Sequence, residues 1–430
     1  MSSKTKTTAT KEEASPALVP KLRFPEFREA EGWKVTQLQK IARPVADRAV
    51  TGDGDNILSL SGEHGLVLQS DYFGKKIAGD SAERYLKLLR NDFVYNDRTT
   101  KASTFGTIKR LSKYSGGIVS PIYKCFRFHA DENPVFWEWY FESGSHEAQL
   151  GSPVNEGARA GRFNISISQF LSTSAWRPDK PEQQKIAKCL SSVDELIAAQ
   201  ARKLDALKTH KKGLMQQLFP REGETQPRLR FPEFQNEGEW EDQSVGDFGK
   251  VVTGSTPSTA QPAFYGGGIP FVSPADISDL RFVDQTKTTL TAVGFAQTRP
   301  IRAGSVLFVC IGSTIGKVAQ NVHDCATNQQ LNAVVPSSKH SDGFVYFALS
   351  FASERIALLA GRQAVPIINK SLFSEVRVLA PKLPEQQRIA SCLSSLDALI
   401  TAETQKVEAL KTHKKGLMQQ LFPTPEEVEA

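Results

Sequence analysis

Apolar residues recur in alternating steps of three and four along two long stretches of the chain, residues 181–220 and 384–423. This spacing places the apolar side chains along one seam of a helix, which is the pattern of a coiled coil. A proline stands at both ends of each stretch, where it suits a first helical turn and a stop. The sequence therefore predicts two long helices that pair through their seams. The predicted seam consists of Ile186, Leu190, Val193, Ile197, Leu204, Leu207, Lys211, Leu214 and Leu218 in the first helix, and Ile389, Leu393, Leu396, Ile400, Glu403, Val407, Leu410, Leu417 and Leu421 in the second.

Polar residues interrupt both seams at the same two places. They are Gln200 and Lys211 in the first helix, and Glu403 and Lys414 in the second. An antiparallel pair that sets Lys211 against Glu403 and Gln200 against Lys414 also matches the apolar layers. Because a buried polar pair can fix a register at some cost in stability, we expect this register within one chain. The alternative is that each helix packs on its own domain, with the polar ends of its seam in solvent.

The two helical stretches are copies of each other, since 30 of their 40 positions are identical. A second repeat precedes each copy: the segment Leu22-Arg-Phe-Pro-Glu-Phe27 returns as Leu229-Arg-Phe-Pro-Glu-Phe234. The chain is therefore an internal tandem repeat of one unit, a block of about 155 residues followed by a helix.

The two blocks share a layout more than a sequence. Runs of β-branched residues, bounded by Gly, Pro, Ser and Asn, alternate with helical segments such as 134–142 and 343–360. We expect an α/β (mixed α+β) fold, with two such blocks separated by a pair of long antiparallel coiled-coil helices and related by pseudo-two-fold symmetry. The expected divisions are a disordered tail at 1–20, a block at 21–180, a helix at 181–220, a second block with a short linker at 221–383, a helix at 384–423 and an acidic tail at 424–430.

Composition places the chain among globular proteins. Its 430 residues are 40% hydrophobic and 23% charged, and no apolar run reaches the roughly 20 residues that cross a bilayer. The first twenty residues lack the apolar core of a secretory signal. Five cysteines without a Cys-x-x-Cys pair argue against disulfides and zinc. We therefore expect a cytoplasmic protein without a membrane partner.

Charge is distributed unevenly along the chain, although its net value is only +6. Residues 98–130 contain seven Lys and Arg and no acid, and residues 285–323 also lack acids. Each block thus has a basic segment of the kind that meets a phosphate backbone. Chance clustering on a solvated face is the alternative.

Catalytic motifs are not recognised in the sequence. The segment Gly312–Val318 resembles a phosphate-binding loop but fails on spacing, and Asn133-Pro134-Val135-Phe136 is only a near miss to an adenine methyltransferase motif. The histidines do not cluster with acids or cysteines at ligand spacing. We expect no catalytic residues, no metal site and no cofactor in this chain.

Taken together, these repeats resemble a known family, the specificity (S, HsdS) subunits of type I restriction–modification systems. The resemblance rests on the two Pro-Glu-Gln-Gln…Lys-Gly-Leu-Met-Gln-Gln-Leu-Phe helices and the two Arg-Phe-Pro-Glu-Phe segments. Further motifs are Thr253–Pro257, Gly267–Pro274, Gly312–Lys317, Asn328-Gln329, Tyr85–Tyr95 and Phe105–Lys109.

The resemblance implies that each block is a target recognition domain and that the two domains read the halves of a split DNA site. It implies that the helices dock two methyltransferase (M) subunits, which bind S-adenosylmethionine and modify adenine. Restriction (R) subunits, which use ATP and Mg, would join through the M subunits. This chain would supply the sequence specificity and no chemistry.

Arg and Lys suit phosphates and guanine, and Asn and Gln suit adenine, so polar residues of the motifs and basic segments are candidate contacts to double-stranded DNA. A coiled-coil adapter that assembles proteins without reading DNA is the main alternative, and a standalone nuclease or methyltransferase is a third. The candidates are Arg98, Lys101, Lys109, Arg110, Lys113, Arg159 and Arg162 in the first block, and Ser255, Thr256, Ser273, Lys317, Asn328, Arg362 and Lys370 in the second.

Overall fold

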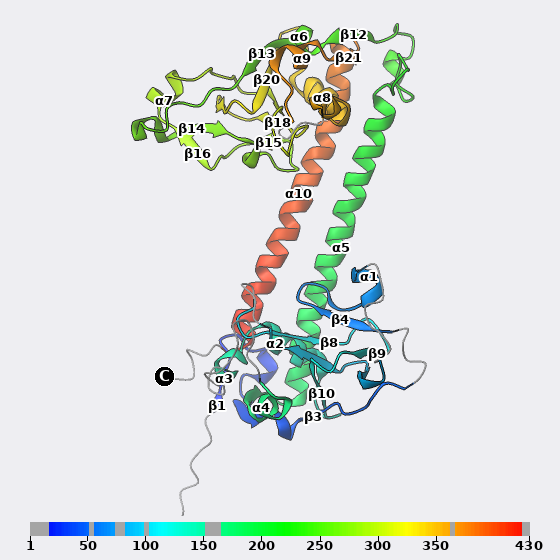
Figure 1. Ribbon diagram of the computed structural model, residues 1–430, viewed down its shortest axis with the longest axis vertical. Coiled ribbons are helices and arrows are strands. Elements are labelled where there is room, and N and C mark those ends of the chain that lie inside the picture. Colours follow the sequence, from blue (N-terminus) through cyan, green and yellow to red (C-terminus); the bar gives the residue numbers. More distant parts are fainter. Residues whose placement is uncertain are drawn as a thin grey trace, which may run out of the picture. The chain divides into compact units, whose positions relative to one another are not determined.

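The computed structural model describes residues 17–50, 56–73, 82–98, 103–150, 165–361 and 366–423. The chain divides into two compact units (Figure 1). Unit 1 comprises residues 1–198 and 409–430, and unit 2 comprises residues 199–408. Each unit contains one block together with parts of both long helices, α5 (Lys180–Leu218) and α10 (Leu383–Leu421).

Unit 1 is built from short antiparallel sheets. The largest has the strand order β3-β10-β7-β8, and a second has the order β1-β2-β11. The strands are β1 (Ala17–Leu18), β2 (Trp33–Gln37), β3 (Ala42–Pro44), β4 (Leu58–Ser61), β5 (Gly65–Leu68), β6 (Leu86–Leu89), β7 (Phe93–Asn96), β8 (Thr107–Arg110), β9 (Gly116–Val119), β10 (Lys124–Phe128) and β11 (Ser174–Arg177); the short helices are α1 (Gln69–Phe73), α2 (Pro134–Glu142), α3 (Glu147–Leu150) and α4 (Ile167–Ser172).

Helix α2 forms the centre of the unit 1 core. It starts where Asn133 Oδ1 accepts hydrogen bonds from the backbone N–H groups of Val135 and Phe136, with Pro134 in the first turn. Its aromatic side chains then pack on the sheet: the Trp137 ring stacks on Phe128 with centroids 4.8 Å apart. Since burying one large apolar side chain stabilises a fold by roughly 1.5–3 kcal/mol, this aromatic cluster holds α2 on the sheet.

Unit 2 has a larger mixed sheet of five strands, in the order β13-β20-β17-β18-β15, beside a three-stranded sheet β16-β14-β19. Within the described residues, one helix, 342–360, is long and apolar enough to cross a membrane, and half of it is buried in the core of this unit. The strands are β12 (Glu241–Ser244), β13 (Gly249–Thr253), β14 (Tyr265–Val272), β15 (Phe282–Val283), β16 (Thr288–Leu290), β17 (Val306–Val309), β18 (Val318–Asn321), β19 (Ala326–Thr327), β20 (Leu331–Pro336) and β21 (Arg377–Ala380); the helices are α6 (Val245–Phe248), α7 (Ala292–Ala296), α8 (Asp342–Ala357) and α9 (Lys370–Glu375).

The segments of α5 and α10 pack together antiparallel within each unit (Figure 1). In unit 1, Ile186 and Leu190 near the start of α5 share a core with Leu421 at the end of α10. In unit 2, Leu218 at the end of α5 shares a core with Ile389 and Leu393 of α10. Every residue of the predicted seam is buried or half-buried. The sequence predicted helices at 181–220 and 384–423; each helix begins one residue earlier and ends two residues earlier.

The register predicted from the sequence is wrong. Glu403 lies against Gln200 and accepts a hydrogen bond from its amide, while Lys203 Nζ is 2.6 Å from Glu403 Oε1. Lys211 instead binds Asp397, with Nζ 2.5 Å from Oδ1. The physical reason is that aspartates directly beside the seam provide a charged partner for the lysine, so the pairing is not limited to seam positions. Gln200 and Glu403 occupy the same position of the repeat, so this contact joins equivalent positions of the two helices.

The repeated Leu-Arg-Phe-Pro-Glu-Phe segments anchor the starts of the long helices. In unit 1, Arg23 forms a bidentate ion pair with Glu182 of α5, with nitrogen–oxygen distances of 2.9 and 2.7 Å. In unit 2, Arg230 forms the same pair with Glu385 of α10, at 2.9 and 2.7 Å. These four side chains are almost fully buried. The repetition of both motifs thus reflects one structural contact made twice.

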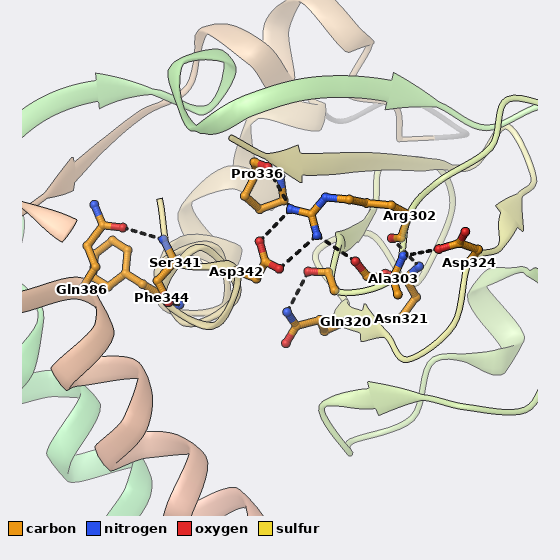
Figure 2. A network of polar contacts seen from close by, with 11 residues as sticks. Arg302, Ala303, Gln320, Asn321, Asp324, Pro336, Ser341, Asp342, Phe344 and Gln386 are labelled. Atoms are coloured by element: carbon orange, nitrogen blue, oxygen red, sulfur yellow. Dashed lines mark hydrogen bonds and ion pairs between the residues drawn. The ribbon is translucent and has the colours of Figure 1, made fainter. Parts of the chain in front are cut away.

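The next residue of each helix, a glutamine, holds the inner helix of the block. Gln183 Oε1 accepts a hydrogen bond of 2.9 Å from the backbone N–H of Asn133, the N-cap of α2. Gln386 Oε1 accepts one of 3.1 Å from the N–H of Ser341, the N-cap of α8 (Figure 2). Equivalent residues of α5 and α10 therefore tie α2 and α8 to the long helices, although the two blocks differ in sequence.

Candidate functional site

Several candidate residues of the second block gather where strands of unit 2 begin and end. The backbone N–H of Ser255, after β13, donates to Thr327 O at 2.9 Å, and the N–H of Asn328 donates to Val272 O at 3.1 Å. Ser273 follows Val272 directly at the end of β14. These hydrogen bonds bring together segments that are up to about 75 residues apart in the sequence. We call this group the polar loop cluster; it consists of Ser255, Thr256, Ser273, Asn328, Gln329 and Gln330.

The polar loop cluster depends on a close approach of two loops. A Cβ atom at Gly254 would lie 2.0 Å from the carbonyl oxygen of Asn328, so only glycine fits there. Thr256 Oγ1 then lies 2.7 Å from Gln329 Oε1, and the Asn328 amide donates to Gln330 Oε1 at 2.9 Å. Thr256 and Gln329 are exposed. Their hydroxyl and amide groups are the kind that can hydrogen-bond to base edges or phosphates.

Three further candidates of the second block do not belong to the polar loop cluster. Lys317, in the loop after β17, is exposed and its Nζ donates to the carbonyl of Ile277 at 3.1 Å, four residues beyond Ser273. Lys370 is exposed in the first turn of α9, two residues after Ile368, whose N–H donates to Cys310 O. Arg362 lies outside the described residues.

The basic segment of the first block is not free of acids in space. Lys109 Nζ lies 2.7 Å from Glu142 Oε1, and Arg110 donates two hydrogen bonds to Glu138 Oε2. Both acids belong to α2, which packs on β8. Lys124 and Arg127 likewise pair with Asp97 and Asp92. Folding therefore brings carboxylates from neighbouring elements to these four cations, although the segment itself contains no acid.

Lys109, Arg110 and Lys113 instead line a polar cavity of about 500 Å³ in unit 1. Its other walls come from α2 and from the long helices, including Asp194 and Lys414. Burial raises the pKa of Glu138, and the charge of Arg110 opposes that rise. The cavity is thus lined by charged side chains of both signs, from the block and from the long helices.

The remaining candidates of the first block are set apart from this cavity. Arg98 is exposed just after β7, and its N–H donates to Asn96 Oδ1 at 3.3 Å. Lys101, Arg159 and Arg162 lie outside the described residues. The sequence-based reading did not include Gln329 and Gln330 among its contacts, although the polar run 328–330 between two buried strands was a usable signal.

Two cysteines of unit 2, Cys310 and Cys325, are buried thiols. Burial raises the pKa of Cys310 and of Cys325 to about 12, so both remain thiols rather than nucleophilic thiolates. Among the residues that the structure describes, no three His, Cys, Asp or Glu side chains come together where they could hold a metal ion. What the site can do with hydroxyl, amide and ammonium groups is form hydrogen bonds and ion pairs.

Comparison with known proteins agrees with this arrangement. Residues 237–412 match a family model described as Type I restriction modification DNA specificity domain. The HindI specificity subunit of Haemophilus influenzae is 32% identical over 147 residues, which are 33% of this chain and 32% of that protein. The MjaIX specificity subunit of Methanocaldococcus jannaschii is 29% identical over 179 residues, 40% of this chain and 41% of that protein. The matches thus span about a third to two-fifths of the length of these relatives.

Solved structures share the fold over most of the chain. The S subunit of a type I restriction–modification system from M. genitalium has a TM-score of 0.58 at 14% identity and covers 94% of this chain and 99% of its own. A chain from a structure of the type I R-M system has a TM-score of 0.55 at 18% identity, with coverages of 91% and 97%. The chain thus carries a match to a type I restriction modification DNA specificity domain over residues 237–412, and it is similar in sequence and in fold to type I restriction enzyme specificity subunits.

Proposed function

We propose that this chain is the DNA sequence-specificity subunit of a type I restriction–modification complex, and that its two blocks are target recognition domains for the two halves of a split DNA site. The observation that carries the proposal is that equivalent helix residues, Gln183 and Gln386, hold a different block in each unit. The attachment to the long helices is the same in both units, while the attached blocks differ in sequence. This is expected of two recognition domains that are related by a pseudo-two-fold axis and read different DNA sequences. The specificity-domain match over residues 237–412 supports this role for block two.

In this proposal the polar loop cluster is the part of unit 2 that contacts bases, and Lys317 and Lys370 contact phosphates. Exposed amide and hydroxyl groups can read base edges, while ammonium groups give affinity that depends on salt. In unit 1, Arg98 and the candidates outside the described residues take the corresponding role. The chain itself is non-catalytic and binds no cofactor.

The long helices are proposed to dock two methyltransferase subunits, which supply S-adenosylmethionine, and through them restriction subunits, which supply ATP and Mg. The support is an exposed leucine at the same repeat position of each helix: Leu196 is 51% exposed and Leu399 is 50% exposed. In this proposal the repeated exposed leucine is the point at which apolar side chains of each methyltransferase subunit pack on the helix. The complex would act in the cytoplasm. Leu196→Asn with Leu399→Asn should weaken co-purification of the methyltransferase, and unchanged co-purification would remove these residues from the interface.

Selection of binding sites from random DNA tests the recognition role. The complex of this chain with its methyltransferase subunit should select a bipartite site. Thr256→Ala with Gln329→Ala should change the bases selected in one half and leave the other half unchanged, whereas Gln285→Ala, at an exposed position two residues after β15, should change neither. If the wild-type complex forms but selects no sequence, the chain is a coiled-coil adapter, the alternative function, and the proposal fails. Activity of the purified chain with S-adenosylmethionine or Mg would contradict the non-catalytic role.

A further inference from the structure

A buried arginine joins the recognition block of unit 2 to helix α10. Arg281, just before β15, is 8% exposed, and its guanidinium carbon lies 4.7 to 4.9 Å from the ring centroids of Phe282, Tyr346 and Phe347. Such a cage of aromatic rings holds a desolvated cation by cation–π attraction. These three rings all belong to the block, and they therefore hold the guanidinium group in place relative to it.

The same guanidinium makes directional contacts on both sides of the boundary. Its Nε donates to Gln320 Oε1 at 2.8 Å, and the Gln320 amide in turn donates to Gly304 O within the block. Its Nη1 donates to Ser394 Oγ of α10 at 2.6 Å. Because these donors lie in one rigid plane, the arginine restricts how the block can rotate against α10.

A carboxylate of α10 completes the contact. Asp397 Oδ1 lies 2.5 Å from Lys211 Nζ of α5, and Asp397 Oδ2 lies 3.7 Å from Arg281 Nη1. Lys211 also lies 5.2 Å from the ring centroid of Phe347 on α8. One aspartate thus joins both long helices and the block. We call Arg281, Lys211, Asp397 and Phe347 the reader junction.

Packing around the reader junction is tight at Gly343 of α8. A Cβ atom at Gly343 would lie 2.9 Å from Arg281 Nη2 and 3.1 Å from Ala390 Cβ of α10. The absence of a side chain at Gly343 allows α8 to approach both the arginine and α10. Gly343 therefore contributes to the close packing of α8 against Arg281 and α10.

Unit 1 repeats the core of the junction with residues at the same positions of the helices. Lys414 Nζ lies 2.6 Å from Asp194 Oδ1 and 4.2 Å from the ring centroid of Trp139 on α2. Lysine and aspartate come from the repeated helices, while the aromatic ring comes from the variable block. The contact thus stands where a constant helix pair meets a variable reader in each unit.

We propose that Arg281 is a positioning residue that fixes the orientation of the unit 2 recognition block on the helix pair and thereby sets how strictly the complex discriminates the spacer length of its DNA site. The proposal rests on the proposed function as a reader of a split site. Arg281 contacts α10 and the inner face of the block, not the polar loop cluster, so it governs where the block is held and not which bases are read. A block that can rotate on α10 fits neighbouring spacers at a smaller loss of affinity, and specificity is such a difference of affinities.

The test measures affinity for spacer variants of the selected site. The complex with the methyltransferase subunit is bound to duplexes that keep both half-sites and carry spacers one or two base pairs longer or shorter. Arg281→Gln should retain both half-site sequences, while its preference for the wild-type spacer over its neighbours falls by about tenfold. Arg281→Lys keeps the charge but not the planar donors, so its preference for the wild-type spacer should lie between those of the wild type and Arg281→Gln. Arg355→Gln, at an exposed arginine on helix α8 of the same block, should behave as wild type.

Ser394→Ala removes one acceptor of Arg281 without altering the aromatic cage. This variant provides the test if Arg281→Gln does not fold. It should relax spacer discrimination in the same direction, to a smaller extent. Spacer discrimination within about twofold of wild type in folded Arg281→Gln, or in Ser394→Ala where Arg281→Gln does not fold, would overturn the inference. Loss of one half-site sequence with spacer discrimination intact would also overturn it, since that would make Arg281 a base-reading residue. If the wild-type complex selects no split site, the proposed function fails first, and the role of Arg281 falls with it.

Discussion

Replacing Lys109 and Arg110 together with alanine separates a DNA-contact role from a structural role. Each phosphate contact that a protein makes contributes about 0.9 to the slope of log affinity against log salt, so loss of two contacts would reduce the slope by about 1.8. In the structure both cations pair with acids of α2, at 2.7 Å for Lys109–Glu142 and 2.6 Å for the shorter Arg110–Glu138 contact. We therefore expect the slope to change by less than about 0.5.

We expect the replacement of Arg110 to lower the free energy of unfolding instead. The Arg110 and Glu138 side chains are 12% and 18% exposed, between the limits of a surface pair and a buried one, so losing Arg110 should cost about 2 kcal/mol at neutral pH. Burial already raises the pKa of Glu138, and Arg110 holds that rise down. Without Arg110 the folded state binds the Glu138 proton more tightly than the unfolded chain does. The variant's stability deficit should therefore be largest at pH 7 and shrink as the pH falls toward 5.

The assay combines DNA-binding titrations at several salt concentrations with thermal unfolding between about pH 5 and pH 8. Adding Glu138→Gln to Arg110→Ala should recover part of the stability, because the buried group is then neutral. A salt slope lower by about 1.8 with unchanged unfolding would refute the structural assignment and restore both residues to the DNA interface.

Three other predictions follow from particular contacts. Arg230→Met leaves Glu385 buried without its partner and should lower the free energy of unfolding by about 3–5 kcal/mol, measured by denaturant unfolding, and a loss below about 1 kcal/mol would contradict the burial of this pair. The hydrogen bond from Lys203 lowers the pKa of Glu403, so Glu403 stabilises the fold above its ordinary pKa of 4.5 and loses that contribution as the pH falls through the lowered value. Glu403→Gln should flatten stability against pH in that acid range, and an unchanged profile from thermal melts would reject the assignment. Removing one heptad from each long helix, in phase with the seam, shortens the helix pair by roughly 10 Å at 1.5 Å per residue, so sites selected from a spacer library should lose about three base pairs of spacer; an unchanged spacer at full affinity would show that the helices do not set it.

The sequence determined the long helices and their seams, because periodicity and terminal prolines are local properties. It also determined that two units share one plan, since Arg23 and Arg230 stand in the same motif and make the same ion pair. Mixed α and β elements followed from β-branched runs for the same reason. The helices and strands depend on neighbours a few residues apart, and the shared plan is visible because the same motifs occur twice in the sequence.

Only the tertiary structure decided which groups meet. The register followed aspartates beside the seam, Asp194 and Asp397, that reach the lysines once the helices are packed. Lys109 and Arg110 of the acid-free segment are paired with acids because α2 lies on β8 and carries Glu138 and Glu142. The polar loop cluster exists because Gly254 lets its loop approach Asn328 from a distant strand. Charge pairing and close packing act through space between segments far apart in the chain, and a one-dimensional pattern does not record those distances.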